Sequence, residues 1–385
     1  MDLSRCSMVV ISLTALVACG CHASYLVGRN SGDGSTGAGG ATSADGGLGG
    51  GGVATGGAGV GGQSRVPGTG GAADTGVGGA SGAPGTGGVA DAGVDGASGA
   101  PGTGGAPSVA CDLSKPFGTP ALVASLNVGS QEIEVWLTDD SSTALVALRR
   151  TGLGCCDIYG ASRTANGDFG PLAPLVSIND NAALYENRRP VLSPDRMTLF
   201  FASNRPVGDA GFGMKIFVAT RNDALADFGT PGPLAGENLG AQDSPGSLSA
   251  DGHLLYLDSD LGSNRDIYVR DLTTGGPPTP VAELNTGANE ASAVISHDGR
   301  TIYFGTMRPL PGTAADAAVK RDFDVWIAHR SDATGTFSNL APVTELNTPF
   351  TEVPNWLSPD GCTIYLSSNR DSVELSIWAA SKPAN

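Results

Sequence analysis

The stretch Ser296-His297-Asp298-Gly299-Arg300-Thr301-Ile302-Tyr303-Phe304 joins a tight turn to an apolar strand. In a Ser-x-Asp-Gly turn the Asp side chain caps its own backbone, and the Gly accepts a positive φ. Similar stretches begin at Ser193, Ser249 and Ser358, and a degenerate copy covers residues 138–147. Repetition of one unit along a chain is typical of modular folds. The sequence therefore predicts several copies of one unit within residues 111–385.

Each unit has the same order of segments around its turn. An apolar run precedes the turn, as in residues 291–295, and a second strand follows it. A third strand begins with Asp, as in Asp266-Ile267-Tyr268, and the unit ends in Leu-Asn, as at Leu346-Asn347. Short strands with turns between them, and no helical periodicity, are typical of propeller blades. We predict an all-β β-propeller of five blades, each of four antiparallel strands, with six blades as the alternative.

The repeated phrase also carries a family resemblance. Ser-Pro-Asp-Gly followed by Ile-Tyr, and then Ser203-Asn204-Arg205 or Ser368-Asn369-Arg370, resembles the WD-like repeat of TolB-type propellers. The resemblance covers most of residues 111–385 and implies the propeller fold. The family's rings have six blades, whereas five units occur here. Such blades serve binding proteins, periplasmic scaffolds and peptidase accessory domains, so the resemblance implies no single function.

The N-terminal region predicts export and a lipid anchor. Residues 1–18 have the short apolar run of a signal peptide, too short to span a membrane. The run ends in Leu16-Val17-Ala18-Cys19-Gly20, which resembles a bacterial lipobox with Cys19 as the acylated residue; the alternative is an ordinary cleavage site. No Asp follows Cys19, which favours the outer membrane. Residues 19–110 are Gly/Ala-rich and predict a disordered, flexible tether, with neutral low-complexity drift as the alternative.

Composition limits the possible partners and cofactors. The net charge of −16 argues against nucleic acid and against anionic membrane surfaces, so membrane contact is expected through the N-terminal lipid only. The scarcity of His and the absence of a zinc-type spacing predict no metal site and no cofactor. In an oxidising envelope a Cys111–Cys362 disulfide would staple the ring closed. A vicinal Cys155–Cys156 bridge, or a bridge from one of these to Cys111, is the alternative.

A set of polar residues recurs from unit to unit. An acid precedes the first strand, an Arg follows the second, and an Asp opens the third, so all of them are expected on one face of the disc. One interpretation makes them structural ion pairs; the other makes the acids a ligand-binding ring at the channel mouth. The acids are Glu132, Glu186, Asp243, Glu290 and Glu352, and the predicted ion-pair residues are Arg205, Arg265, Arg308, Arg370, Asp157, Asp266 and Asp324, with Arg149 or Arg150 in the first unit.

The sequence favours binding over catalysis. No unit is expected to carry a singular acid, and neither a serine-hydrolase elbow nor a phosphate-binding loop is present, so no catalytic residue is assigned. Tyr185, Arg188 and Arg189 are expected to be exposed, and Trp356 to pack between blades rather than line the channel. We therefore predict a monomeric, lipid-anchored scaffold protein of the bacterial envelope that recognises a protein or an envelope polysaccharide. A carbohydrate-active hydrolase with catalytic carboxylates in the channel is the alternative.

Overall fold

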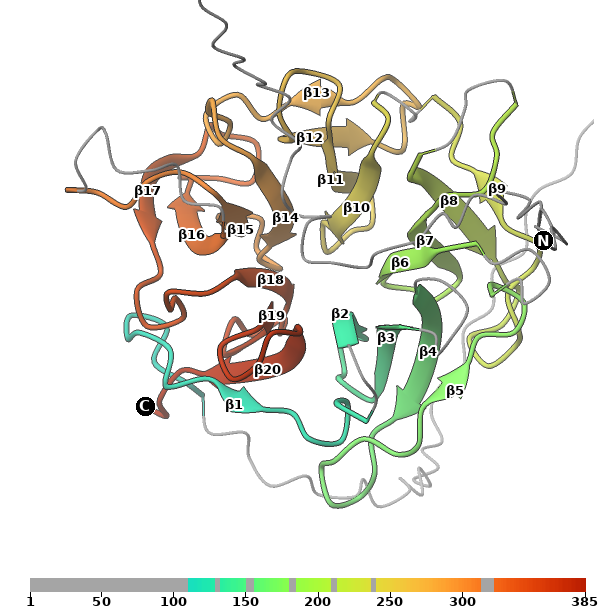
Figure 1. Ribbon diagram of the computed structural model, residues 1–385, viewed down its shortest axis with the longest axis horizontal. Coiled ribbons are helices and arrows are strands. Elements are labelled where there is room, and N and C mark those ends of the chain that lie inside the picture. The colour runs from blue at the N-terminus through green and yellow to red at the C-terminus, as the bar shows by residue number, and fades with distance from the viewer. Residues whose placement is uncertain are drawn as a thin grey trace, which may run out of the picture. The chain divides into compact units, whose positions relative to one another are not determined.

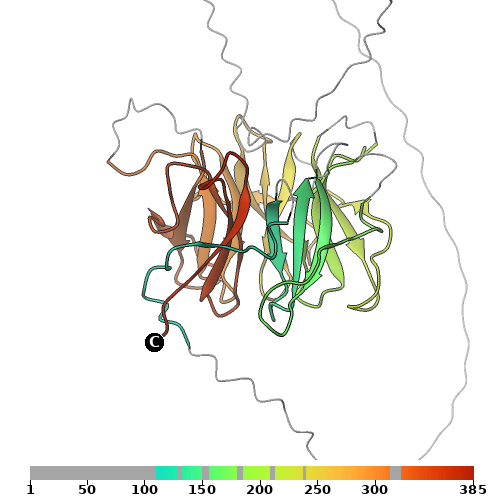
Figure 2. The same ribbon diagram turned by 60° about the horizontal axis from the view of Figure 1, so that its bottom comes forward.

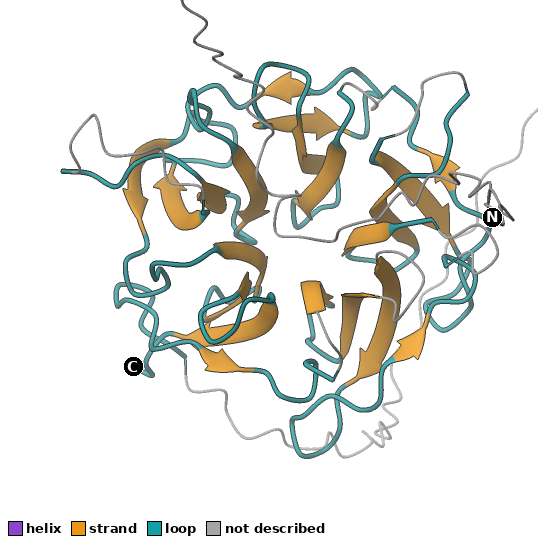
Figure 3. Ribbon diagram, in the orientation of Figure 1, coloured by secondary structure: helices purple, strands orange, loops and turns teal. Residues whose placement is uncertain are grey.

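The computed structural model describes residues 110–128, 132–149, 156–179, 185–208, 213–236, 240–312 and 322–385. The predicted signal peptide, the acylated Cys19 and nearly all of the tether lie outside these residues. Within the described ranges every regular element is a strand, and no helix occurs (Figure 3).

Five four-stranded antiparallel sheets surround a central axis (Figure 1). Seen obliquely, their strands run between the two faces of the disc (Figure 2). The predicted five-bladed propeller is confirmed, and the six-bladed alternative is wrong. The first blade contains β2 (Glu132–Leu137), β3 (Thr143–Arg149), β4 (Cys156–Ser162) and β5 (Ala173–Pro174); the second contains β6 (Asn187–Leu192), β7 (Thr198–Ser203), β8 (Lys215–Thr220) and β9 (Gly232–Pro233); the third contains β10 (Asp243–Leu248), β11 (Leu254–Ser259), β12 (Asp266–Asp271) and β13 (Thr279–Pro280); the fourth contains β14 (Glu290–Ile295), β15 (Thr301–Thr306), β16 (Asp324–His329) and β17 (Ser338–Pro342).

The fifth blade joins the two ends of the propeller. It consists of β18 (Glu352–Leu357), β19 (Thr363–Ser368) and β20 (Ser376–Ser381), and β1 (Ala121–Leu122) pairs with β20 as its outermost strand. Cys111 and Cys362 form a disulfide with their Cα atoms 5.7 Å apart, which confirms the predicted bridge. Cys156 is buried at the start of β4, and burial raises the pKa of its thiol. The ring is therefore closed both by strand pairing and covalently.

The turn between the first and second strands of a blade has one hydrogen-bond pattern throughout. In the fourth blade the Ser296 Oγ donates to Asp298 Oδ1 at 2.6 Å, and the backbone N–H of Arg300 donates to the same oxygen at 3.0 Å. Gly299 has a φ of 68°. The degenerate copy repeats this pattern, because Thr138 Oγ1 donates to Asp140 Oδ1 at 2.7 Å. Its classification as a fifth unit is thus confirmed.

The Leu-Asn ending of a unit fastens the chain to the third strand of the blade. Asn285 Oδ1 accepts the Ile267 N–H at 2.8 Å, and Asn285 Nδ2 donates to the Ile267 carbonyl at 2.9 Å. The side chain therefore pairs as a neighbouring strand would, and satisfies both backbone groups of a buried residue. The same pair of bonds is made by Asn127 with Ile377, Asn179 with Ile158, and Asn347 with Val325.

The core lies between adjacent blades. The cluster between the third and fourth blades joins Tyr256 and Ile267 of one to Phe304 and Trp326 of the other. Because the blades stack their apolar faces on one another, side chains of the innermost strands are left facing the axis. This arrangement brings the residues considered next together.

Candidate functional site

The innermost strand of every blade lines the axis of the propeller. These strands are β2, β6, β10, β14 and β18, which lie nearest the centre in Figure 1. Each one shifts register once against its neighbour, at a β-bulge. Bulges re-aim side chains and are frequent beside functional sites. Residues at four of these bulges, Arg189, Gly246, Ser292 and Asn355, line the channel.

The bulges hold the backbone in uncommon conformations. Arg189 and Ser292 have φ values of 49° and 55°, in the left-handed region that non-glycine residues rarely occupy. Gly246 has no room for a side chain, because a Cβ there would lie 2.7 Å from the Ala293 carbonyl oxygen. Strain of this kind persists where the surrounding structure over-determines it, and it clusters at functional sites.

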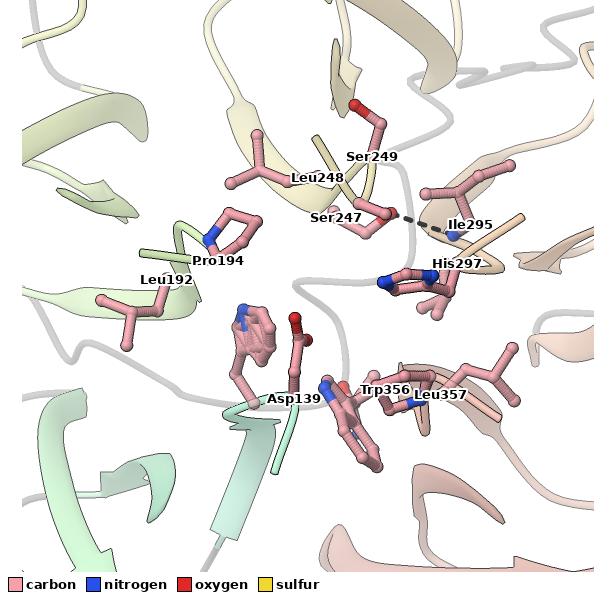
Figure 4. Close-up of a pocket in the computed structure, with 16 residues that line it drawn as sticks. Asp139, Leu192, Pro194, Ser247, Leu248, Ser249, Ile295, His297, Trp356 and Leu357 are labelled. Carbon is pink, nitrogen blue, oxygen red and sulfur yellow. Dashed lines mark hydrogen bonds between the residues drawn. The ribbon is translucent and has the colours of Figure 1, made fainter. Parts of the chain in front are cut away.

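A cavity opens where the innermost strands end and the Ser-x-Asp-Gly turns begin (Figure 4). All five blades contribute to it, and its empty volume is about 530 Å³ including open solvent. We call this space the mouth cavity; its apolar walls are Trp136, Leu192, Leu248, Ile295, Trp356 and Leu357. Asp139, His297 and Asn355 add polar groups to the walls. Concave, mainly apolar sites with a few polar groups are typical of ligand sites.

Two tryptophans from neighbouring blades meet in the mouth cavity. The ring centroids of Trp136 and Trp356 lie 6.3 Å apart, and Trp356 also packs edge-on against Tyr365 at 5.7 Å. Trp356 is 5% exposed, whereas Trp136 is half-buried. The expected packing of Trp356 between blades is confirmed, although this residue lines the channel as well. Trp136 offers the larger accessible aromatic surface.

A belt of charged residues lies deeper in the channel. Arg189 joins two acids from different blades: its Nη1 lies 2.9 Å from Asp258 Oδ1, and its Nε lies 3.8 Å from Glu134 Oε1. Arg265 Nη1 lies 3.1 Å from the other Asp258 oxygen. The Ser292 N–H also donates to Asp258, at 3.0 Å. We define the channel belt as Glu134, Glu186, Arg188, Arg189, Asp258 and Arg265, in which Arg188 pairs with Glu186.

Glu134 is the acid of the channel belt that lines a second hollow of the channel. Its side chain is buried, with 7% of the residue exposed, and it lines a hollow of about 260 Å³ that shares Gly246 and Asn355 with the mouth cavity. Burial raises the pKa of its carboxyl, and the nearby Arg188 and Arg189 oppose that rise. Within the described part of the chain no group hydrogen-bonds to Glu134 Oε2. A buried oxygen in this state is costly unless something else binds it.

Two of the predicted ring acids are held by their own blades. Glu290 Oε1 accepts from the Thr286 and Thr306 hydroxyls, each at 2.7 Å, and lies 3.2 Å from Arg308 Nη2. Glu352 repeats this with Thr348, Ser368 and Arg370 in the fifth blade, and its carboxyl lies 3.6 Å from the Arg370 guanidinium. Burial raises the pKa of Glu352. These groups lie at the beginning of the first strand, on the face opposite the mouth cavity.

The other three ring acids differ from this pattern. Asp243 Oδ2 lies 3.4 Å from the Lys215 ammonium, and Asp243 Oδ1 accepts the Gly240 N–H at 3.0 Å. In the second blade the register gives the equivalent position to Asn187, which accepts from Arg205 at 2.7 Å, while Glu186 pairs with Arg188. The side chain of Glu132, like Arg150, lies outside the described part of the structure.

The predicted ion-pair residues lie in three environments. Arg308 and Arg370 pair with Glu290 and Glu352, and Arg205 binds Asn187 and stacks near Tyr185, with 5.6 Å to the ring centroid. Arg265 pairs with Asp258 in the channel belt rather than with Asp243. Asp157 and Asp324 are buried at the start of their strands, whereas half-buried Asp266 accepts from Asn264 at 3.0 Å. Arg149 lies 3.9 Å from Glu374 in a partly exposed pair.

Two expectations about this region are wrong. Arg188 and Arg189 are buried, because the bulge of β6 turns them inward rather than toward solvent. A singular acid does exist: Asp258 stands next to last in β11, where the equivalent positions in the second, fourth and fifth blades hold Ala202, Gly305 and Ser367. That departure from the repeat is the signal by which the sequence could have revealed the channel belt.

The described residues set two further limits. No group of three or more His, Cys, Asp or Glu side chains among them is placed to hold a metal ion. Over the same residues, no helix has the length and apolar character needed to cross a membrane.

Comparisons with known proteins give matches among solved structures alone. No family model matches the chain, and no curated protein matches it significantly. Among solved structures, TolB from Acinetobacter baumannii aligns at 15% identity with a TM-score of 0.41, covering 70% of this chain and 64% of that one, so this chain spans less than two thirds of that protein. A glycosyl hydrolase from Bacteroides ovatus aligns at 12% identity with a TM-score of 0.42, covering 70% of this chain and 96% of that one. TolB propellers are thus among the similar structures, and neither likeness decides what this chain binds.

Proposed function

We propose that this chain is a binding protein of the bacterial cell envelope, anchored through a lipid on Cys19, whose propeller recognises a protein or an envelope polymer at the mouth cavity. One observation carries the proposal: side chains from all five blades converge in a concave, aromatic-walled cavity on one face. On the opposite face, Glu290 and Glu352 are held by their own blades. The converging surface is therefore the better candidate for recognition than the acid ring.

The state of the carboxylates supports binding over hydrolysis. A glycoside hydrolase needs two carboxyl groups that are free to exchange a proton and to attack or activate water. Asp258 instead accepts hydrogen bonds from Arg189 and the Ser292 backbone, and it forms an ion pair with Arg265. Glu290 and Glu352 are each engaged by two hydroxyls and an arginine. Interactions of this number hold a carboxyl group in place rather than leave it free to react.

The location rests on the N-terminal sequence. A short apolar run before Cys19, followed by a long Gly/Ala-rich segment, suits a folded domain held away from a bilayer. Replacing Cys19 by Ala should move the protein from the membrane fraction to the soluble fraction of the cell envelope. Membrane association that survives the substitution would remove the lipid anchor from the proposal.

Binding at the mouth cavity can be tested with paired surface variants of the full chain. His297→Glu adds a charge to the mouth cavity, whereas Val373→Glu adds one to the β19–β20 loop on the opposite face, where the side chain is 91% exposed. Affinity capture from detergent-solubilised envelopes should recover a partner with the wild type and with Val373→Glu, and lose it with His297→Glu. The opposite result would transfer recognition to the acid-bearing face, and no capture by any of the three would reject envelope binding.

A further inference from the structure

The hollow lined by Glu134 presents a buried acceptor without a hydrogen bond among the described residues. Glu186 Oε1 and Asp258 Oδ2 also lack one, but each of these oxygens faces an arginine. Glu134 Oε2 is buried, lines the channel and has no hydrogen-bond donor within the described part of the chain, while Oε1 faces Arg189 at 3.8 Å. A carboxylate oxygen only accepts hydrogen bonds, so the missing partner must be a donor. The arrangement is a built feature, because a β-bulge of β2 and the strained backbone of Arg189 both place groups at this point.

Charge in the channel belt selects against ionic ligands. The acids Glu134, Glu186 and Asp258 are matched by Arg188, Arg189 and Arg265. An ammonium group brought to Glu134 would meet the neighbouring arginines, and an anion brought to the arginines would meet the acids. Desolvation penalises either ion further at this depth. An uncharged hydroxyl donates to Glu134 Oε2 without either penalty.

The walls of the channel near Glu134 add an aromatic surface and an amide to the carboxylate. Trp136 is two residues farther along β2, so its side chain leaves the same face of the strand as that of Glu134. It lines the mouth cavity, while Asn355 lines both the mouth cavity and the hollow at Glu134. A ligand ring that has an apolar C–H face can stack on the indole of Trp136, while hydroxyl groups at the edge of that ring bond to the neighbouring polar groups. Asn355 Nδ2 donates to Ser367 Oγ at 2.7 Å, and this bond orients its amide oxygen.

We infer that the channel binds one neutral saccharide unit, which enters through the mouth cavity, stacks on Trp136 and donates a hydroxyl hydrogen bond to Glu134 Oε2. The inference rests on the proposed binding function and names the chemistry of its ligand. Within that function it selects an uncharged glycan over a protein, a polyamine or an acidic polymer.

Titration calorimetry on the full chain tests the inference directly. The probes are neutral oligomers of glucose, of mannose and of N-acetylglucosamine, with spermidine and oligogalacturonate as cationic and anionic comparisons. At least one neutral oligomer should bind and quench tryptophan fluorescence, and the charged probes should bind at least tenfold more weakly. Binding by a charged probe alone, or by no neutral probe at millimolar concentration, would overturn it.

Two variants locate the site. Glu134→Gln keeps the shape but replaces an acceptor oxygen by an amide donor, and should weaken saccharide binding at least fivefold. The matched control is Glu283→Gln, since Glu283 Oε1 accepts the Phe337 N–H away from the channel; it should leave the affinity unchanged. If Glu134→Gln lowers the melting temperature so far that it cannot be titrated, a crystal structure of the wild type with the oligomer decides. A sugar hydroxyl at Glu134 Oε2 supports the inference, and a water alone there overturns it.

The outcomes separate this inference from the proposed function. A protein partner captured through the mouth cavity, with no saccharide binding, would keep the binding function and reject the saccharide. Saccharide binding followed by release of reducing ends, abolished in Glu134→Gln, would keep the saccharide and replace binding by hydrolysis.

Discussion

At the Leu-Asn ending of a unit, one asparagine side chain makes the two hydrogen bonds that a neighbouring strand would otherwise make. Asn285 takes this role in the third blade. Because an amide supplies both a donor and an acceptor, this role explains why the repeat keeps asparagine at this position. Asn285→Ala should lower the free energy of unfolding by about 1–3 kcal/mol, because the N–H of buried Ile267 loses its partner and the Ile267 carbonyl keeps only the Val281 N–H. Urea denaturation measures the effect. Asn222→Ala, at an exposed loop position, is the control, and an equal effect of both would reject the explanation.

Two equivalent turns allow the cost of a positive φ to be compared between serine and glycine. Ser141 has a φ of 55° where Gly252 has 72° in the equivalent turn. Ser141→Gly should stabilise the protein by about 0.5–1 kcal/mol, since the left-handed penalty exceeds the added freedom of the unfolded chain. Gly252→Ser should destabilise it by about 1–2 kcal/mol, and its Cβ would also meet Pro194 Cδ at 3.3 Å. Thermal melts of the two variants should shift in opposite directions; shifts of the same sign would contradict the argument.

Among whole elements, the turns of the second and third blades make stability depend on acid pH. A hydroxyl and a backbone N–H donate to Asp195 and to Asp251, and the Ser193 and Ser249 hydroxyls hold the pKa values of these carboxyls below their usual range. A group whose folded pKa is lowered contributes stability that is present above its unfolded pKa, about 3.9, and is lost as the pH falls through the folded value.

Replacing both aspartates by asparagine tests this dependence. The amide oxygen still accepts the two hydrogen bonds but does not titrate in this range. Between pH 7 and pH 2.5 the melting temperature of the wild type should fall more steeply below about pH 4 than that of the Asp195→Asn/Asp251→Asn double variant. Parallel curves for the two proteins would show that the turns contribute nothing to acid unfolding.

The elements also show how far sequence reasoning reaches. Turns, third strands and Leu-Asn endings were predictable, because each is a local pattern repeated in register. The acid ring was misaligned in the second blade, where Asn187 rather than Glu186 occupies the position of Glu290. The channel belt was missed because it depends on non-repeated residues, such as Asp258, that bulges and closure of the ring bring together. Spacing along one strand does not encode a contact between blades.

For the molecule as a whole, ring closure places every blade beside two others. The apolar faces between blades are buried only when the fifth blade is complete, and its outermost strand comes from the other end of the propeller. Stability of the separate blades is therefore linked through one seam between β1 and β20. The channel depends on the same seam, since its lining strands come from all five blades.

The Cys111–Cys362 disulfide secures this seam, and its removal supplies the last prediction. It closes a loop of 251 residues, so the Cys111→Ser/Cys362→Ser variant should lose about 2–5 kcal/mol of unfolding free energy. Hydrogen exchange should accelerate first in β1 and β20, and less in β11 and β12 across the ring. A reductant should lower the denaturation midpoint of the wild type toward that of the variant and leave the variant unchanged. Equal midpoints for oxidised wild type and variant would mean that pairing of β1 alone holds the ring closed.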